Sequence, residues 1–185
     1  MYSRQFFTLA FTAFFTIILL FSCSSPKGNV EDIPLPEHPR PDKERADWIN
    51  LNGYWQFEFD SSNVGLNETW QNPIKHFSKQ ILVPFPWGAP LSEVENLADI
   101  AWYKRNITIP SSWKGKRVFL VVGASDWLTN GWIDGKEIGQ YQGGYTPFEF
   151  ELTDHVNFGQ TQEIVLRVDD SPHDFKLFGK QGYGD

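Results

Sequence analysis

The chain has 185 residues, of which 41% are hydrophobic and 21% charged, a composition typical of a globular protein that can bury a core. The formal net charge is −7 and no cluster of Lys and Arg is present, which argues against a nucleic-acid partner. Aromatic residues make up 16%, and together with 15 Gly and 12 Pro they favour strands and turns.

The N-terminus has the pattern of a secretory signal peptide. Arg4 precedes an apolar run, Phe6 to Phe21, that is shorter than the about 20 residues of a membrane span. The run ends in Leu20-Phe21-Ser22-Cys23, which resembles the bacterial lipobox, where a small residue precedes the cysteine that is lipidated. A buried core thiol is the alternative for Cys23. It is the only cysteine, so no disulfide can form within the chain.

We therefore expect residues 1–22 to be a lipoprotein signal peptide and residues 23–46 to be a lipidated tether. The tether holds five prolines among charged and polar residues, which favours an extended, polyproline-like chain. Acyl chains on Cys23 would anchor the protein to a membrane. Ser24 follows the cysteine, which in the enterobacterial sorting pattern indicates the outer membrane. The predicted location is the bacterial envelope, at the periplasmic face or the cell surface.

Residues 47–185 carry the pattern of short strands and are expected to form one domain. Trp55, Phe57 and Phe59 alternate with polar residues, which predicts a half-buried strand. The segment 61–78 is polar and irregular, with Trp70 as its expected anchor.

A short buried run, Ile81-Leu82-Val83, follows this irregular segment. Pro84 and Pro86 stop the run, and because proline cannot donate a ladder hydrogen bond, residues 84–88 are predicted to form a rigid loop at a sheet margin. A loop or one short helical turn over 89–99 leads to the next strand.

The centre of the chain, 102–153, holds at least four apolar runs separated by turn residues. The run 116–123 is apolar on both faces, which predicts a strand in the middle of a sheet. Asp134-Gly135 lies between two further runs and predicts a type I′ hairpin, since that turn needs positive φ at both centres. Alternating strands are also expected over 148–152 and 162–168.

Seven or eight short strands at this spacing, with no helical pattern, predict an all-β sandwich. The connections are too short for helical crossovers, so the strands are expected to be antiparallel.

Six short motifs follow one another along the domain: Leu51-Asn52-Gly53-x-Trp55-x-Phe57, Val83-Pro84-x-Pro86-Trp87, Trp102-Tyr103-x-Arg105, Arg117-Val118-x-Leu120-x-x-Gly123-Ala124, Gly135-Lys136-x-x-Gly139 and Gly143-Gly144-Tyr145-x-Pro147-Phe148. Each alone is weakly specific. In this order they are similar to the N-terminal sugar-binding domain of glycoside hydrolase family 2, the family of β-galactosidases, β-glucuronidases and β-mannosidases. The resemblance implies a jelly-roll, galactose-binding-domain-like sandwich, followed in that family by an immunoglobulin-like sandwich and a TIM barrel.

The resemblance also implies that the catalytic pair lies outside this domain. In the family, the two glutamates lie on the barrel, about 5 Å apart as a retaining mechanism requires. A barrel takes about 250 residues, so we expect no catalytic residue in this chain and no activity from it alone.

No other constellation in the sequence predicts chemistry. Glu149 and Glu151 would lie about 7 Å apart on one strand face and are interpreted as a solvated face. Asp169-Asp170 is interpreted as a turn or capping pair. The four histidines have no metal-ligand spacing, so neither a metal nor another cofactor is expected.

Sugar binding requires aromatic faces and planar polar groups. Trp87, Trp127, Trp132 and Tyr145 are the candidate stacking residues, and core packing is the stronger alternative for the tryptophans. From the resemblance, Asn96 is the nearest match to a loop Asn that reaches the active site in some β-galactosidases. Those enzymes also place an Asp after the last strand, where this sequence has Lys180-Gln181, so metal-assisted galactose binding is not expected.

Two hypotheses about partners stay open. In the first, the domain binds a β-glycoside as the non-catalytic part of a glycosidase. In the second, it docks on a catalytic glycosidase domain and binds no sugar itself.

Overall fold

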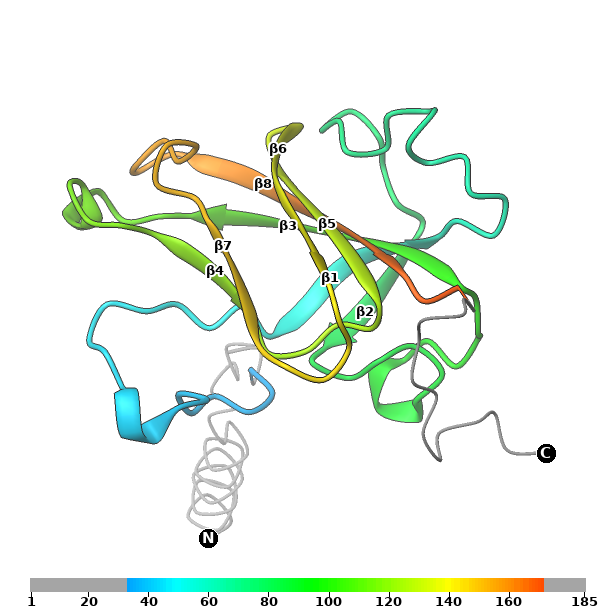
Figure 1. Ribbon diagram of the computed structural model, residues 1–185, viewed down its shortest axis with the longest axis horizontal. Helices are drawn as coiled ribbons and strands as arrows, with labels where there is room; N and C mark the ends of the chain where they lie inside the picture. The colour runs from blue at the N-terminus through cyan, green and yellow to red at the C-terminus, as the bar shows by residue number, and fades with distance from the viewer. Residues whose placement is uncertain (1–32, 172–185) are drawn as a thin grey trace, which may run out of the picture. The chain divides into compact units, whose positions relative to one another are not determined.

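The computed structural model describes residues 33–171, which form a β-sandwich (Figure 1). Within these residues there are eight strands: β1 (Gly53–Phe59), β2 (Lys79–Val83), β3 (Ile100–Thr108), β4 (Phe119–Val122), β5 (Leu128–Ile133), β6 (Lys136–Gln142), β7 (Phe148–Glu151) and β8 (Thr161–Asp169). Three short 3₁₀ helices accompany them: η1 (Pro41–Lys43), η2 (Pro90–Ser92) and η3 (Ser111–Trp113).

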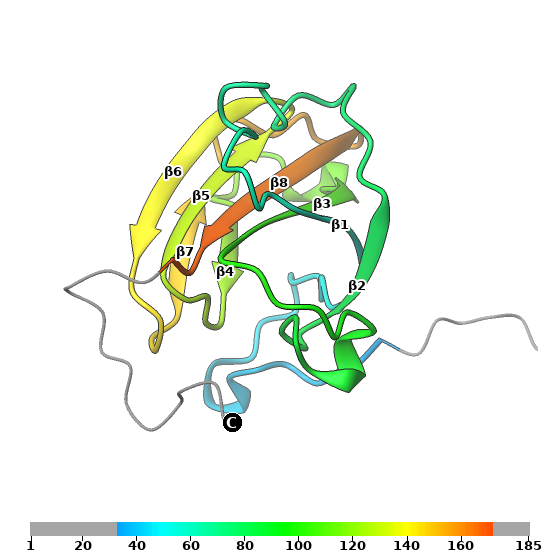
Figure 2. The same ribbon diagram turned by 90° about the vertical axis from the view of Figure 1, so that its right-hand side faces the viewer.

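The strands form two sheets, and all of their pairings are antiparallel. The larger sheet has six strands in the order β2-β1-β3-β8-β5-β6, and the smaller one consists of β4 and β7. Figure 2 shows the larger sheet curving around the space that the smaller one closes. The prediction of an all-β antiparallel sandwich is therefore confirmed.

Local sequence explains several of these elements. Trp55 and Phe57 of β1 are 5% and 0% exposed, as their alternation predicts. The turn between β5 and β6 has φ of 48° at Asp134 and 76° at Gly135, which confirms the predicted type I′ hairpin. The segment that starts with Pro84 directly follows β2, which is an edge strand, as predicted for a loop at a sheet margin.

The core on the inner face of the large sheet is almost entirely apolar. It joins Phe57, Ile81 and Ile164 of the large sheet to Leu120 of β4 and Phe150 of β7. All five side chains are buried, so the small sheet is held to the large one by hydrophobic packing.

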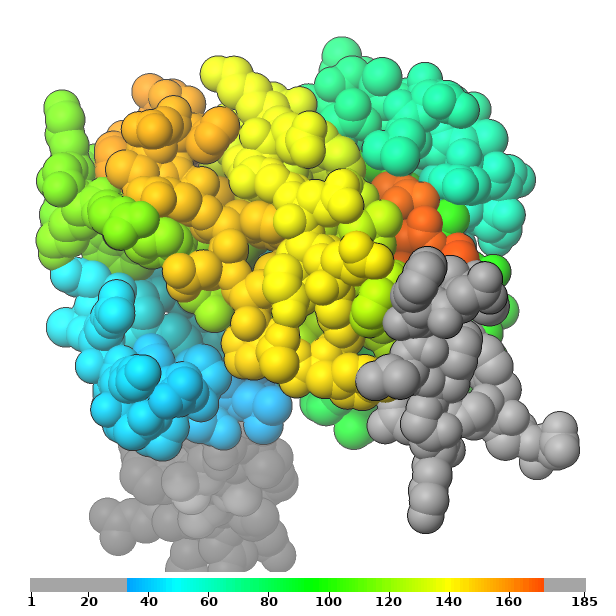
Figure 3. Space-filling view, in the orientation of Figure 1, coloured from blue at the N-terminus to red at the C-terminus, as the bar shows by residue number. Residues whose placement is uncertain are grey.

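The outer face of the large sheet is covered by the irregular segment 60–78. Trp70 and Phe77 of this segment pack on Trp102, Trp132 and Val165, which confirms the anchoring role predicted for Trp70. In the space-filling view the teal atoms of this segment form one corner of the molecule (Figure 3). The sandwich therefore has a second, smaller core on its outer face.

The position predicted for the strand over 116–123 was wrong. The observed strand β4 is shorter and, among residues 33–171, pairs with β7 alone, so it lies at an edge of the described sheet and not in its middle. Its outward residues explain why its apolar pattern was misleading: Phe119 lies under the Arg117 guanidinium, 4.7 Å from the ring centroid, and Val121 is 61% exposed.

The described end of the predicted tether, 33–46, is tied to the start of the domain. Asn50 Nδ2 donates to the Leu35 carbonyl and Asn52 Nδ2 to the Pro34 carbonyl, both at 2.9 Å. The predicted signal peptide, Cys23 and Lys180-Gln181 lie outside the described residues. Across residues 33–171, no helix has the length and apolar character needed to cross a bilayer.

Candidate functional site

One end of the sandwich gathers most of the loops that could contact a ligand. The strand pairings Leu128–Asp169, Leu128–Gln142 and Val122–Phe148 place the end of β8, the start of β5, the end of β6 and the start of β7 at the same end of the molecule. We call this the loop end; it comprises the segments 95–99, 123–127 and 143–147 together with Asp169 and Asp170.

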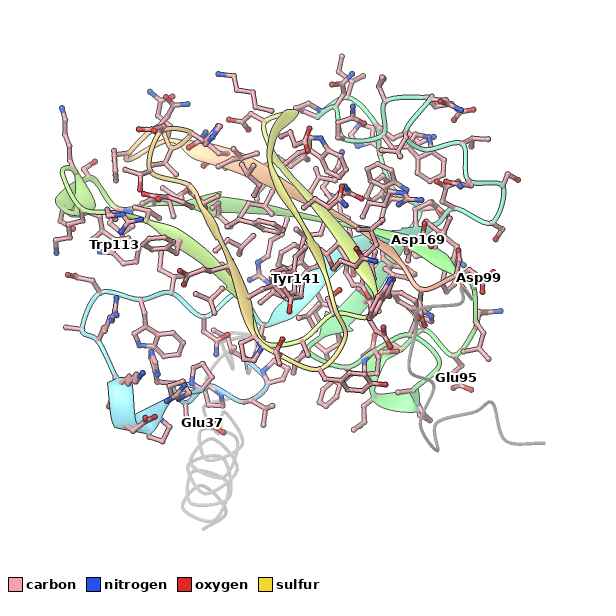
Figure 4. The ribbon with its side chains drawn as sticks, in the orientation of Figure 1. Glu37, Glu95, Asp99, Trp113, Tyr141 and Asp169 are labelled. Carbon is pink, nitrogen blue, oxygen red and sulfur yellow. The ribbon has the colours of Figure 1, made fainter. Side chains whose placement is uncertain are left out.

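Backbone hydrogen bonds hold the loop end together. Trp127 N–H donates to the Asp169 carbonyl at 3.2 Å, and Gly143 N–H donates to the Trp127 carbonyl at 2.8 Å. Asp170 N–H donates to the Asp99 carbonyl at 2.7 Å. The labelled side chains of Asp99 and Asp169 lie near each other in Figure 4. Each loop is therefore fixed by its neighbour, which gives a potential binding surface a defined shape.

Two of the candidate aromatic residues belong to this end. Trp127 is half-buried, and Tyr145, on the loop between β6 and β7, is 61% exposed. The neighbouring residue is Gly144, and its lack of a side chain lets the Asp126 carboxyl group pack against this loop. A Cβ at that position would lie 2.7 Å from the Asp126 carboxyl carbon. An exposed aromatic face on a fixed loop is the arrangement that stacking on a sugar requires.

The loop end is acidic. The segments 95–99 and 123–127 and the end of β8 bring five carboxylates together: Glu95, Asp99, Asp126, Asp169 and Asp170. A carboxylate accepts hydrogen bonds from hydroxyl groups, so this end offers acceptors beside its aromatic residues. Sequence reasoning did not single out Asp99 or Asp126, since neither lies in a recognisable motif and only the folded loops bring them to one end.

The carboxyl group of Asp169 has defined partners. Its oxygens accept from Arg167 Nη2 at 2.9 Å and from Ser171 N–H at 3.1 Å. Burial alone would raise the pKa of Asp169, but the hydrogen bonds from Ser171 and Arg167 together hold it below its ordinary value. Asp169 is therefore ionised at neutral pH, and its contact with Ser171 agrees with the predicted capping role.

Asn96 is exposed on the segment that leads into Asp99. The structure therefore brings Asn96, Trp127 and Tyr145 to the same end of the sandwich.

The other two candidate aromatics lie elsewhere. Trp132 is 6% exposed and stacks on Trp102, with ring centroids 5.4 Å apart. Trp87 is half-buried and packs on the aromatic rings of the inner core, with its centroid 6.2 Å from that of Tyr103. Both tryptophans therefore pack in a core, as the alternative to sugar stacking predicted.

The described residues offer no catalytic pair on β7. Glu149 and Glu151 are exposed, as a solvated face would be. Glu151 accepts from Arg117 Nε at 3.0 Å and from Nη2 at 2.7 Å. These hydrogen bonds lower the pKa of Glu151 to about 2, so it is a poor proton donor at neutral pH. Between Ile33 and Ser171, no group of three His, Cys, Asp or Glu side chains is arranged to hold a metal ion.

Comparison with known proteins identifies relatives of this sandwich. The family model described as "Glycosyl hydrolases family 2, sugar binding domain" matches residues 49–176. A β-glucuronidase of Paenibacillus borealis is 28% identical over 126 residues, which cover 64% of this chain and 20% of the relative. A β-galactosidase of Thermoanaerobacter pseudethanolicus is 26% identical over 152 residues, covering 72% and 19%. The chain thus spans about a fifth of the length of these curated relatives.

Solved structures share the fold. A β-glucuronidase from Ruminococcus gnavus, in complex with C6-substituted uronic isofagomine, superposes with a TM-score of 0.60 at 22% sequence identity. The match covers 66% of this chain and 21% of that chain. At this identity the likeness establishes the fold of the domain.

Proposed function

This chain belongs to the family of glycosyl hydrolase family 2 sugar-binding domains, and from that membership we propose that it is the non-catalytic, carbohydrate-binding-type domain of a glycosidase acting on β-linked sugars. The observation that carries the proposal is the family match, which spans residues 49–176 and so includes every strand of the sandwich. The acid/base and nucleophile of such an enzyme would lie outside this domain.

Within the domain, we propose that the loop end faces the carbohydrate. Tyr145 supplies an exposed aromatic face, Trp127 a half-buried one, and Asn96 a side-chain amide. Carboxylates such as Asp99 add acceptors for sugar hydroxyls. Their common position at one end, on loops fixed by backbone hydrogen bonds, supports this assignment.

Sugar titration followed by NMR tests the assignment. Methyl β-galactoside and methyl β-glucuronide are added separately to the chain from residue 24 onward, and shifts are expected at the loop end. Tyr145→Ala should weaken binding about tenfold, because it removes an aromatic stacking partner. Tyr145→Phe is the matched control, since it keeps the aromatic face and removes only the hydroxyl group. Equal effects of the two substitutions would contradict the assignment.

The proposal also predicts that the chain by itself does not hydrolyse aryl β-glycosides. Incubation of purified chain with aryl β-galactoside and aryl β-glucuronide should release no more aryl alcohol than buffer. Turnover that follows the protein through successive purification steps would show that the chain carries its own active site.

A second candidate function is docking on a catalytic glycosidase domain without any contact to sugar. Exposed leucines on the segment between β2 and β3 favour it, since Leu91 is 65% exposed and Leu97 57%. Binding to a glycan array at micromolar affinity would count against this alternative. Loss of binding to a catalytic domain in Leu91→Ser and Leu97→Ser, with sugar shifts absent in the parent chain, would favour it.

We propose in addition that Cys23 carries a lipid anchor and that the protein lies in the bacterial envelope, on the outer membrane. The proposal rests on the apolar run and the lipobox-like Leu20-Phe21-Ser22-Cys23. Metabolic labelling with palmitate in a bacterial host should label the chain and not its Cys23→Ser variant. Ser25→Ala is the control that leaves the cysteine intact. Equal labelling of the Cys23→Ser variant would contradict the anchor.

A further inference from the structure

The loop between β6 and β7, residues 143–147, carries the exposed Tyr145 but begins with two glycines. Glycine loses more conformational freedom on folding than any other residue, so Gly143 and Gly144 make the first half of the loop costly to order. Pro147 restricts φ only at the last position of the loop. Contacts from outside the loop backbone therefore decide how Tyr145 is presented.

Tyr141 makes contacts of this kind. It is the last residue but one of β6 and is labelled in Figure 4. Its ring stacks on Phe148 at the start of β7, with the centroids 4.1 Å apart and the planes 11° apart. Phe148 is buried in the inner core, so the ring of Tyr141 has a fixed support. Beyond the ring, the Tyr141 hydroxyl and Thr146 Oγ1 form a hydrogen bond of 2.7 Å. The hydroxyl thus bonds to the residue that directly follows Tyr145.

Gly143 lets the Tyr141 side chain take this position. A Cβ at Gly143 would lie 3.0 Å from the Tyr141 hydroxyl oxygen and 3.2 Å from its Cε1, closer than a side chain normally packs. The backbone of Gly143 is itself fixed, because its N–H donates to the Trp127 carbonyl at 2.8 Å. The loop is therefore held near its start by the segment 123–127 and near its end by the Tyr141 hydroxyl.

We propose that Tyr141 is a positioning residue for carbohydrate binding: through its hydrogen bond to Thr146 it fixes the loop in the conformation that presents Tyr145 to a sugar ring. The inference rests on the proposed function, because it takes Tyr145 as the stacking residue. Tyr141 is half-buried and its ring lies against Phe148, which assigns it to support of the loop and not to contact with the sugar. A loop that is ordered before the ligand arrives binds more tightly, since the cost of ordering it is not subtracted from the affinity.

Paired substitutions at the two hydroxyl groups test the proposal. Tyr141→Phe and Thr146→Val each remove one hydroxyl and keep the size of the side chain, and Thr146→Ser is the matched control that keeps the hydroxyl. NMR titration of the chain from residue 24 onward with methyl β-galactoside and methyl β-glucuronide measures the affinity. Each of the first two variants should bind about fivefold more weakly, which is the effect of one neutral hydrogen bond. The double variant should lose no more than either single variant, because both remove the same bond.

The order of the loop provides a readout that needs no sugar. In ¹⁵N relaxation measurements on the free chain, the amides of Tyr145 and Thr146 should have order parameters of about 0.85 in the parent, falling below about 0.6 in Tyr141→Phe. Thr146→Ser should keep the values of the parent. The amide of Phe150 in β7 serves as the internal reference and should be unchanged in all variants.

Two outcomes would overturn the proposal. The first is unchanged order of Tyr145 and Thr146 in Tyr141→Phe, whether or not a sugar binds. The second is a further loss of affinity when Tyr141→Phe is added to Tyr145→Ala, because a residue that acts only through Tyr145 has no effect once Tyr145 is removed. Failure of the proposed function looks different: neither glycoside binds the parent, or Tyr145→Ala binds as tightly as the parent. In that case the relaxation measurements still decide whether Tyr141 orders the loop.

Discussion

The two faces of the six-stranded sheet are covered in different ways. The inner face is covered by the strand pair β4–β7, which is held to it by a large cluster of buried hydrophobic residues. The outer face is covered by the irregular segment 60–78, and the three buried charged residues of the described chain, Asp60, Lys104 and Arg167, contact that segment or form part of it.

The reason lies in the backbone of each cover. Strands β4 and β7 bond to each other through their ladder, so they need only apolar side chains to adhere to the sheet. An irregular segment leaves its backbone groups without a ladder. Lys104 Nζ donates to the carbonyls of Asn72 and Lys75, at 3.1 and 2.8 Å, and the Asp60 carboxylate accepts from the N–H groups of Val64 and Gly65, both at 2.8 Å. On this face, buried charged side chains therefore satisfy backbone groups that a strand ladder would otherwise bond.

The largest expected effect comes from the inner face. Phe57 is fully buried in the inner core, so Phe57→Ala should lower the free energy of unfolding by about 4 kcal/mol, through lost burial and the cavity left behind. Urea denaturation monitored by tryptophan fluorescence measures the change. Ile74→Ala is the control, since Ile74 is 88% exposed, and it should stay within about 0.5 kcal/mol of the parent. A loss of similar size in the control would mean that the inner core does not dominate stability.

The next effect tests whether a buried charge holds the outer cover. Lys104 is 1% exposed and forms an ion pair with Glu163 at 3.1 Å. Lys104→Met should cost about 3 kcal/mol, because it leaves Glu163 and two backbone carbonyls without their donor. Hydrogen exchange in segment 60–78 should accelerate more than exchange in β4 and β7. The exposed Lys136 provides the matched control Lys136→Met, and uniform acceleration across the domain would contradict a local role.

The smallest effect is a pH dependence at the junction of the outer face and the loop end. The folded pKa of Asp169 is lowered, so its contribution to stability is present above its unfolded pKa of about 3.9 and is lost as the pH falls through the folded value. Asp169→Asn should therefore lower the free energy of unfolding at about pH 7, and the difference from the parent chain should shrink toward about pH 2. Urea denaturation at both values measures the difference. A pH-independent difference would show that the charge of Asp169 is not the cause.

The same contrast explains how much of the molecule the sequence could predict. Strands with period-two alternation, such as that of Phe57, were predicted correctly, and so was the Asp134-Gly135 turn, because both follow from local backbone preference. The partners of a strand are a non-local property, and the apolar pattern of β4 could not reveal that, within the described part of the chain, β7 is its one neighbour. The outer cover was predicted only as an irregular segment anchored by Trp70, since its attachment to Lys104 depends on two carbonyls that have no sequence signature.

The candidate site divides in the same way. Tyr145 was predicted from its position in a glycine-rich loop, and its side chain is indeed exposed. Trp127 and Trp132 were both candidate stacking residues in the sequence, but their surroundings differ. Trp132 lies within the paired part of β5 and stacks on Trp102 in a core, a position that strand pairing decides and residue type does not. Sugar contact by any of these residues stays a prediction.

The side-chain amides of Asn50 and Asn52 donate to the carbonyls of Leu35 and Pro34, respectively, and this would shorten the reach of the proposed lipid anchor. With the segment from Ile33 onward fastened to the domain, only nine residues, 24–32, separate Cys23 from it. A fully extended chain of this length spans about 30 Å. With the proposed acyl anchor on Cys23, such a tether would keep the start of the domain within about 30 Å of the lipid surface.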